Sequence, residues 1–556
     1  MGRPALPRRL VLAAFVALVL AGSVAAADGP VATVTQTLSG LDDVVSGGFE
    51  PPDVQVAAGA GYVVEMVNLA ARTWRTSGGA ALEVQTLDIA AFFGSGNDRL
   101  TDPRIIYDAV SGRWFASISD VDGKNILVAV STSGDPTASW TITSYPAPGC
   151  ADQPRLGVAD GTVVLAADIF ASCVEGGSRP IGAALWVVNK QQLLAGSKQP
   201  DFTTYGPDPN FSSFAPVQSL SPTATEYVVS VDAPRSLVVH LFAVDGIPPG
   251  AVTVEQIATP SINRMSRPPF ATQPPTASGR AQQQLDTNDD RILESVWEND
   301  RLWFSGNTGC VPAGDTLIRS CARIVELSTA TRTVTTDSDL SQRSAHLFYP
   351  AIRPDGSGDL VVVYGESGLS VQPEIVAVGR TPDGAFTNPV VIAQSASAYL
   401  GDRYGDYFGA ARDPANPGLV WVAGEAGTDV AGGRGWATAV ASVAITAPGA
   451  PLPPVIDVVP PPIRAVHATG RVGKAIRLVF RSLGDSVGVR SVVIVRSKGA
   501  VVFTSTTATT SLHSGQLYSV LWRPGKKLRG TLPYCVYSVS PSGAPSTQSC
   551  STVTLR

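Results

Sequence analysis

Histidine is scarce in this chain of 556 residues, with 4 present, and charged residues make up only 16%. So few histidines argue against a Ser-His-Asp catalytic triad. They also argue against zinc, because cysteine and histidine are the usual zinc ligands and no Cys-x-x-Cys pair occurs. After the first 27 residues no apolar run is long enough to cross a bilayer. We therefore predict no metal site of this kind and no membrane span.

The first 27 residues have the three parts of a secretory signal peptide. Arg3, Arg8 and Arg9 supply a basic start, residues 10–24 form an uncharged apolar run, and three alanines at 25–27 fit a cleavage site. The alternative is a membrane anchor, which needs about 20 apolar residues. The pattern favours a precursor whose mature form is secreted, extracellular or attached to the cell surface.

The six cysteines fall in three close pairs. In an exported chain an even number of cysteines indicates disulfides, and short spacing indicates that each bond closes a local hairpin or loop. The predicted pairs are Cys150 with Cys173, Cys310 with Cys321, and Cys535 with Cys550.

Charge divides the chain into two parts. Residues 464–556 carry 13 Lys and Arg against one acid, Asp485, whereas residues 28–463 carry 25 basic and 45 acidic residues. A proline-rich stretch, 448–463, lies where the sign changes and is typical of a stiff linker. We predict an acidic domain at 28–447 and a basic domain at 464–556.

The acidic part is a series of apolar strand pairs separated by turn signals, rich in Gly and Pro, with 190–195 as its one plausible helix. Units of this kind repeated along a chain are typical of the blades of a β-propeller. We expect seven blades, with six as the alternative, and residues 31–38 as the strand that completes the last blade. A β-sandwich array or a β-helix stays open. The predicted pairs are 62–68 with 71–76, 114–119 with 126–131, 162–168 with 184–189, 226–232 with 237–245, 301–305 with 322–328, 359–366 with 374–380, and 419–425 with 436–445.

The basic part contains about seven short strands and is predicted to be a small immunoglobulin-like or fibronectin-like β-sandwich. On an exported protein, its positive charge favours attachment to anionic envelope polymers. A merely solvated surface is the alternative. Nucleic acid is not an expected partner outside the cell.

Acidic and arginine residues recur where the units open, near the expected mouth of the central channel. They form a ring that binds a polar ligand, or they pair to lock neighbouring blades together; the sequence leaves both open. The candidates are Asp53, Asp102, Arg104, Asp152, Arg155, Asp290, Arg291, Arg403, Tyr404 and Asp406.

One opening also resembles the start of a calcium loop. Asp286, Asn288 and Asp290 place oxygen ligands at alternate positions, but Arg291 stands where such a loop needs Gly, and no Glu closes it. We therefore predict no cofactor, with calcium here as the alternative.

A turn motif suggests a family. Ser133-x-Asp135-x-Thr137-x-Ser139-Trp140 lies between two predicted strands, and Thr381-x-Asp383-Gly384-x-Phe386 repeats it later. These segments resemble the Asp-box of bacterial sialidases and related BNR-repeat propellers, with Thr137 where Gly is usual. In that family the motif is structural and its Asp accepts backbone N–H bonds. The resemblance implies a propeller and assigns no catalytic residue.

The sequence favours a binding or scaffold protein that recognises an extracellular ligand such as a glycan. The alternative is a glycoside hydrolase, sialidase-like or of another glycan-cleaving kind. Two facing carboxylates would be required for that chemistry. Since no complete catalytic motif is present, no catalytic residue is assigned.

Overall fold

The computed structural model describes residues 29–77, 81–96, 99–173, 178–275, 284–395, 397–401, 403–427, 435–446, 462–483, 486–507, 510–512, 515–539, 546 and 548–556. The predicted signal peptide and residues 448–461 of the predicted linker lie outside these ranges. Nearly all of the described chain is β-structure. Within these ranges no helix has the length and apolar character needed to cross a membrane.

Residues 31–446 form successive antiparallel units in which each strand mostly pairs with the next along the chain. Their strands are, unit by unit, β2 (Gln55–Gly59), β3 (Tyr62–Met66), β4 (Ala70–Arg75) and β5 (Leu82–Asp88); β6 (Leu100–Asp108), β7 (Arg113–Asp120), β8 (Asn125–Ser131) and β9 (Trp140–Pro146); β10 (Cys150–Val158), β11 (Thr162–Phe170), β12 (Pro180–Asn189) and β13 (Phe202–Asp208); β14 (Ala215–Pro216), β16 (Glu226–Val231), β17 (Arg235–Asp245) and β18 (Thr253–Ala258), with β19 (Ser261–Ser266) also on β17; β20 (Ile292–Glu298), β21 (Arg301–Cys310), β22 (Arg319–Ser328) and β23 (Thr333–Leu340); β24 (Ala345–Pro354), β25 (Leu360–Gly368), β26 (Val371–Arg380) and β27 (Val390–Gln394); and β28 (Gly409–Arg412), β29 (Leu419–Gly427), β30 (Trp436–Thr446) and β1 (Val31–Asp42).

Burial falls from the first strands of a unit to its last. In the third unit β11 is buried along almost its whole length, whereas β13 is largely exposed. The two strands of each predicted pair correspond to the two middle strands of a unit. They read as apolar runs because both of their faces pack against neighbouring units.

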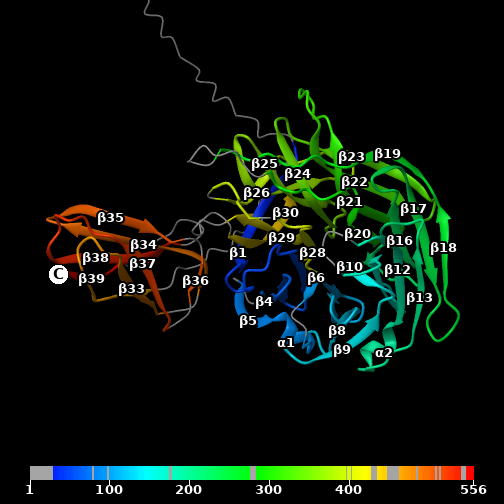
Figure 1. Ribbon diagram of the computed structural model, residues 1–556, viewed down its shortest axis with the longest axis horizontal. Helices are drawn as coiled ribbons and strands as arrows, with labels where there is room; N and C mark the ends of the chain where they lie inside the picture. The colour runs from blue at the N-terminus through cyan, green and yellow to red at the C-terminus, as the bar shows by residue number, and fades with distance from the viewer. Residues whose placement is uncertain are drawn as a thin grey trace, which may run out of the picture.

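The units follow one another around a closed, propeller-like ring (Figure 1). The first strand of each unit contacts the first strand of the next, in the order β2, β6, β10, β14, β20, β24 and β28, and β28 contacts β2 again. A two-residue strand, β15 (Gln218–Ser219), additionally pairs in parallel with β10 and β20. These first strands therefore surround the axis of the ring.

Strand β1 closes the ring, as the sequence predicted. It pairs antiparallel with β30, so that Val34 lies opposite Val443, more than 400 residues away along the chain. Glu65, on β3 of the first unit, is fully buried and accepts a hydrogen bond from the backbone N–H of Leu41 (3.0 Å) and another from the Thr438 hydroxyl. One carboxylate thus joins the first unit to both strands of the closure.

Two short helices interrupt the series of strands, one between the first and second units and one between β12 and β13 of the third unit. The predicted helix at 190–195 is confirmed as α2 (Lys190–Leu194), and the Asn189 side chain caps it by accepting from the N–H of Gln192. The sequence analysis missed α1 (Ile89–Phe93), which Asp88 caps and Gly94 ends in a left-handed conformation. The five residues of α1 are all apolar, so no polar face marks a helix in the sequence.

The C-terminal part consists of two sheets that share one apolar core. Trp522 and Phe480 from one sheet and Tyr534 and Val493 from the other lie in the same buried cluster. The first sheet contains β31 (Ile463–Val466), β33 (Ile476–Ser482) and β37 (Leu517–Trp522); the second contains β32 (Ala468–Gly470), β39 (Ser549–Leu555), β38 (Gly530–Val539), β34 (Ser486–Ser497), β35 (Ala500–Thr506) and β36 (Thr510–Leu512).

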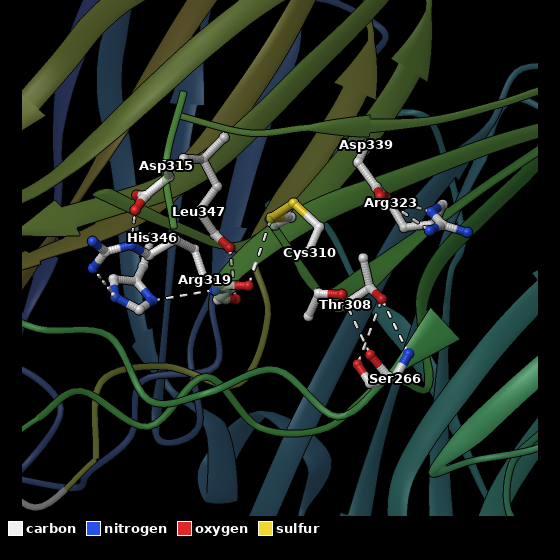
Figure 2. The surroundings of a disulfide bond; sticks show 12 residues. Ser266, Thr308, Cys310, Asp315, Arg319, Arg323, Asp339, His346 and Leu347 are labelled. Atoms are coloured by element: carbon white, nitrogen blue, oxygen red, sulfur yellow. Dashed lines mark hydrogen bonds and ion pairs between the residues drawn. A yellow bond between two sulfur atoms is a disulfide. The ribbon is translucent and has the colours of Figure 1, made fainter. Parts of the chain in front are cut away.

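All three predicted disulfides are confirmed. Figure 2 shows Cys310–Cys321, which links β21 to β22 at the base of an exposed loop. Beside the bond, Asp315 pairs with Arg319 at 3.0 Å, and the N–H of Ser320 donates to His346 Nδ1. The loop is thus held by one covalent bond and by polar contacts to two strands.

We predict that Glu65→Ala destabilises the whole ring. The buried N–H of Leu41 would lose its acceptor, at a cost of about 1–3 kcal/mol, whereas the hydroxyl of Thr438 keeps the carbonyl of Leu41 as an acceptor at 3.1 Å. The free energy of unfolding, measured with urea, should fall accordingly, and β1 should become sensitive to protease. The control Glu65→Gln keeps an acceptor and should lose less. Wild-type stability of Glu65→Ala would contradict this role for β1.

Candidate functional site

The predicted acidic residues lie at equivalent points of successive units, at or just before the first strand. Asp53 and Asp102 have positive φ angles of 54° and 60°, and Gln153, next to Asp152, has φ 45°. The ladder shifts register between Thr101 and Arg104, and the same happens between Asp152 and Arg155. Such bulges turn side chains out of the normal alternation of a strand. Here both bulges lie near the start of the first strand of a unit, next to the axis of the ring.

Three carboxylates from different units converge at this end of the axis. Asp53, Asp102 and Asp406 each place an oxygen atom within 4.8 Å of the others. Their exposed fractions are only 2%, 4% and 5%. In the described part of the chain they are the one group of three such ligands close enough to share a metal ion. We call these three residues the acidic cluster.

Asn68 organises the acidic cluster from β3–β4. Its side-chain N–H donates to Asp53 Oδ2 at 2.7 Å, and its oxygen accepts from the backbone N–H of Asp102 at 2.7 Å. Sequence analysis did not single out Asn68, which lies at the turn between two predicted strands and had no signal of its own.

Burial dominates the electrostatics of the acidic cluster. Burial, followed by the neighbouring carboxylates of Asp152 and Asp406, raises the pKa of Asp102 to about 7 against the opposing effect of Arg104 and Arg403. The pKa of Asp53 is also raised well above its usual value, mainly by burial. The cluster therefore retains a proton close to neutral pH.

Arg403 and Tyr404 are neighbours in one loop, but their side chains point in different directions. Arg403, about half exposed, donates to both carboxylate oxygens of Asp406 and so covers the acidic cluster from the solvent side. Tyr404 is fully buried, donates to the carbonyl of Glu425, and packs edge-to-face on Tyr399. Its ring belongs to the core between units, away from the channel mouth.

Arg291 links the axis to a cleft on the ring face. It pairs with Asp168 on β11 and, at 2.8 Å, with Asp289. Burial raises the pKa of Asp152, and Arg291 is the strongest opposing influence, which places the guanidinium beside the mouth. Asp290 points into protein: it is fully buried and its pKa is raised to about 6, mainly by burial.

The cleft beside Arg291 has a volume of about 690 Å³. Its wall combines charged groups with two partly buried aromatic rings, Phe170 and Phe211. The charged lining residues are Asp168, Arg179, Asp232, Asp289 and Arg291. Sequence analysis found only Arg291 among them. Asp168 ends an apolar strand and Asp289 adjoins a predicted site residue, but neither position carries a motif.

Arg104 and Arg155 lie deeper along the axis than the acidic residues. Each follows its aspartate by two or three positions, and a strand advances about 3.3 Å per residue. Both line a small internal cavity together with Glu294 and Arg353, from β20 and β24. Arg104 pairs with Glu294 of another unit at 3.6 Å and stacks on the Tyr407 ring. Arg104 and Arg155 thus lie beneath the acidic cluster, whereas Arg403 and Arg291 lie beside it.

The residues considered for calcium form an ordinary turn. The N–H of Asn288 donates to Asp286 Oδ1 at 2.8 Å, and Asn288 has φ 57°. Asp286 and Asp290 are not part of the group of three carboxylates that converges within the described residues.

The two Asp-box-like segments join the third and fourth strands of their units. Asp135 accepts from the N–H of Thr137 at 2.8 Å, and the Trp140 indole donates to the carbonyl of Pro136 at 2.9 Å. Asp383 similarly accepts from the Thr381 hydroxyl. Both aspartates stabilise turns and lie away from the axis.

The raised pKa of Asp102 leads to a test. Because the folded protein binds this proton more tightly than the unfolded chain, stability from this group is present below about pH 4 and is lost as pH rises through about 7. Asp102→Asn, which tolerates the same positive φ, should flatten this decline and be more stable than wild type at pH 8. Thermal unfolding from pH 4 to 8 measures it. The exposed control Asp122→Asn should keep the wild-type slope; an unchanged slope in Asp102→Asn would contradict the assignment.

Comparison with known proteins identifies no family. No family model and no curated protein matches this chain. Solved structures give remote similarity: a protein of unknown function from Dyadobacter fermentans has 13% identity and a TM-score of 0.35, covering 75% of this chain and 99% of its own. An α-L-arabinofuranosidase from Fusarium graminearum has 12% identity and a TM-score of 0.35, covering 73% and 97%. A GH32 β-fructofuranosidase from Bombyx mori has 12% identity and a TM-score of 0.28, covering 82% and 86%.

Proposed function

We propose that this protein is a secreted or cell-surface seven-bladed β-propeller that binds an extracellular glycan in the cleft beside the acidic cluster. The cleft itself is the observation that carries the proposal. It offers carboxylates that accept from sugar hydroxyls, guanidinium groups that donate to them, and the faces of Phe170 and Phe211 for the apolar side of a sugar ring. Its volume of about 690 Å³ is of the size that holds a small oligosaccharide.

The existing ion pairs would orient these groups before a ligand arrives. Arg291 is held by Asp168 and Asp289, so its remaining N–H groups have a fixed direction. A guanidinium that is already positioned loses less conformational entropy on binding. Arg179, by contrast, is exposed, and its guanidinium would become ordered only when a ligand binds in the cleft.

Glycan cleavage is the second candidate, and the acidic cluster is the observation that favours it. A retaining glycosidase needs two carboxyl groups about 5 Å apart, one of them protonated near neutral pH. Asp53, Asp102 and Asp406 have that proximity, and the pKa of Asp102 is raised to about 7, mainly by burial. Against this, all three are almost fully buried and Arg403 covers Asp406, so binding remains the primary proposal.

A panel of neutral and acidic extracellular oligosaccharides, assayed for binding and for turnover, tests both candidates. We expect binding that Arg179→Ala and Asp289→Ala weaken about tenfold or more, since each removes a charged hydrogen-bonding partner. Arg99→Ala, an exposed arginine on the second unit, is the matched control and should bind like wild type. Turnover that is lost in folded Asp102→Asn would establish cleavage instead. Binding unaffected by both cleft variants would contradict the location.

We also propose that the C-terminal part is a β-sandwich that attaches to anionic envelope polymers. The outer face of the sheet β31–β33–β37 carries exposed Arg464, Arg477 and Arg481 next to exposed Leu517 and Leu521. Arg464 lies directly opposite Arg481 in the strand register. Like charges in that position repel each other, and a bound polyanion would relieve the repulsion.

The attachment is tested with soluble poly(glycerol phosphate) and the full chain. Affinity should fall steeply as salt rises, because the contacts are between charges. The double variant Arg464→Ser/Arg481→Ser should bind several-fold more weakly. Arg496→Ser/Lys498→Ser removes the same charge from the other sheet and should bind nearly as wild type. Equal weakening by both double variants would show a diffuse charge effect and contradict a specific face.

A further inference from the structure

The internal cavity below the acidic cluster has a net positive lining. It has a volume of about 40 Å³ and lies among β6, β10, β20 and β24. The charged residues that line it are Arg104, Arg155, Arg353 and Glu294, and none of them is more than 9% exposed. Three guanidinium groups therefore face a single carboxylate in a buried space.

Glu294 is already engaged by two of the three arginines. It pairs with Arg353 at 3.1 Å and with Arg104 at 3.6 Å. Arg353 is otherwise well satisfied, because it donates to the carbonyl of Ala410 at 2.9 Å and to Gln218 at 3.0 Å. The donors without partners therefore belong to Arg104 and Arg155.

These two arginines have buried nitrogen atoms that lack acceptors. Nε and Nη2 of Arg104 and Nε and Nη2 of Arg155 have no hydrogen-bond partner within the described part of the chain. The assigned hydrogen bond of Arg155 runs from Nη1 to the carbonyl of Ile292. Burial, together with the positive charges of Arg104 and Arg291, lowers the pKa of Arg155 to about 10 against the opposing effect of Asp168. Leaving charged donors buried and unpaired is costly, so a bound acceptor is expected.

We propose that a monatomic anion of the halide class occupies this cavity and accepts hydrogen bonds from Arg104 and Arg155. Water could accept these bonds but would leave the excess positive charge in place. A cavity needs about 10–15 Å³ for each water-sized occupant, so this one has room for a small ion with about two waters and excludes a sugar. The inference is independent of the proposed glycan cleft.

Such an ion would join successive units around the axis. Arg104 and Arg155 come from β6 and β10, and Glu294 and Arg353 extend the same polar network to β20 and β24. An anion between Arg104 and Arg155 would offset the repulsion between their positive charges and would link β6 to β10. Its expected effect is therefore on the stability of the ring.

Bromide binding to the full-length protein tests the proposal. The protein is exchanged into a gluconate buffer, whose anion is too large for the cavity, and bromide replaces gluconate at constant ionic strength and pH. The unfolding temperature should rise saturably by about 1–3 °C, the order of shift that one kcal/mol produces in a large domain. Bromide anomalous diffraction from crystals should give a peak between Arg104 and Arg155.

Two variants make the test specific. Arg155→Gln should lose the bromide-dependent rise. Arg323→Gln, which breaks the Asp337 and Asp339 pairs near the disulfide in Figure 2, should lower the unfolding temperature in both buffers and keep the rise. If Arg155→Gln does not fold, the anomalous peak in wild-type crystals decides. No saturable rise and no peak in the cavity would overturn the proposal and leave water as the occupant.

Discussion

The pairing of β1 with β30 is the constraint on which the rest of the ring depends. Each unit buries its faces against two neighbours, so an open ring would leave the first and last units with exposed apolar faces and an unpaired strand edge. Strand β1 removes that edge, and Glu65 fastens it to the first unit. The acidic cluster lies across the same junction: Asp53 and Asp102 belong to the first two units and Asp406 to the last. Closure of the ring therefore assembles the acidic cluster.

The positions of the aspartates and arginines along the axis follow from the geometry of the first strands. These strands lie side by side around the axis. Aspartates at the starts of the strands therefore come together, and arginines two or three residues later lie further along the axis. Bulges at Asp102 and near Asp152 locally change the direction of the side chains. The arrangement places carboxyl groups with raised pKa values at one end and, beneath them, guanidinium groups with unpartnered nitrogen atoms.

Sequence reasoning could find the elements whose signal is local and strong. The middle strands of the units are continuous apolar runs, the closing strand is an orphan run before the first unit, and the cysteines are close pairs. All of these have their expected places. The predicted site residues at Asp53, Asp102 and Asp406 also meet in space, because equivalent positions of repeated units converge on an axis.

Other residues could not be found, because their role depends on packing between distant units. Asn68, Asp168, Glu294 and Arg353 occupy unremarkable strand or turn positions and gain their contacts only when the ring closes. Tyr404 is the opposite case. Its neighbours in the sequence lie at the mouth of the channel, but its own ring packs in the core. A side chain's direction at a bulge or loop is set by tertiary contacts, which the order of residues along the chain does not reveal.

A crystal structure of the protein with the tightest-binding oligosaccharide is the decisive test of glycan binding in the cleft. We expect a sugar in the cleft between β11 and the end of β16, with a ring against Phe170 or Phe211 and hydroxyl groups within hydrogen-bond distance of Arg291 or Asp289. A sugar bound only on the C-terminal sheets, or on a face of the ring remote from Arg291, would contradict it.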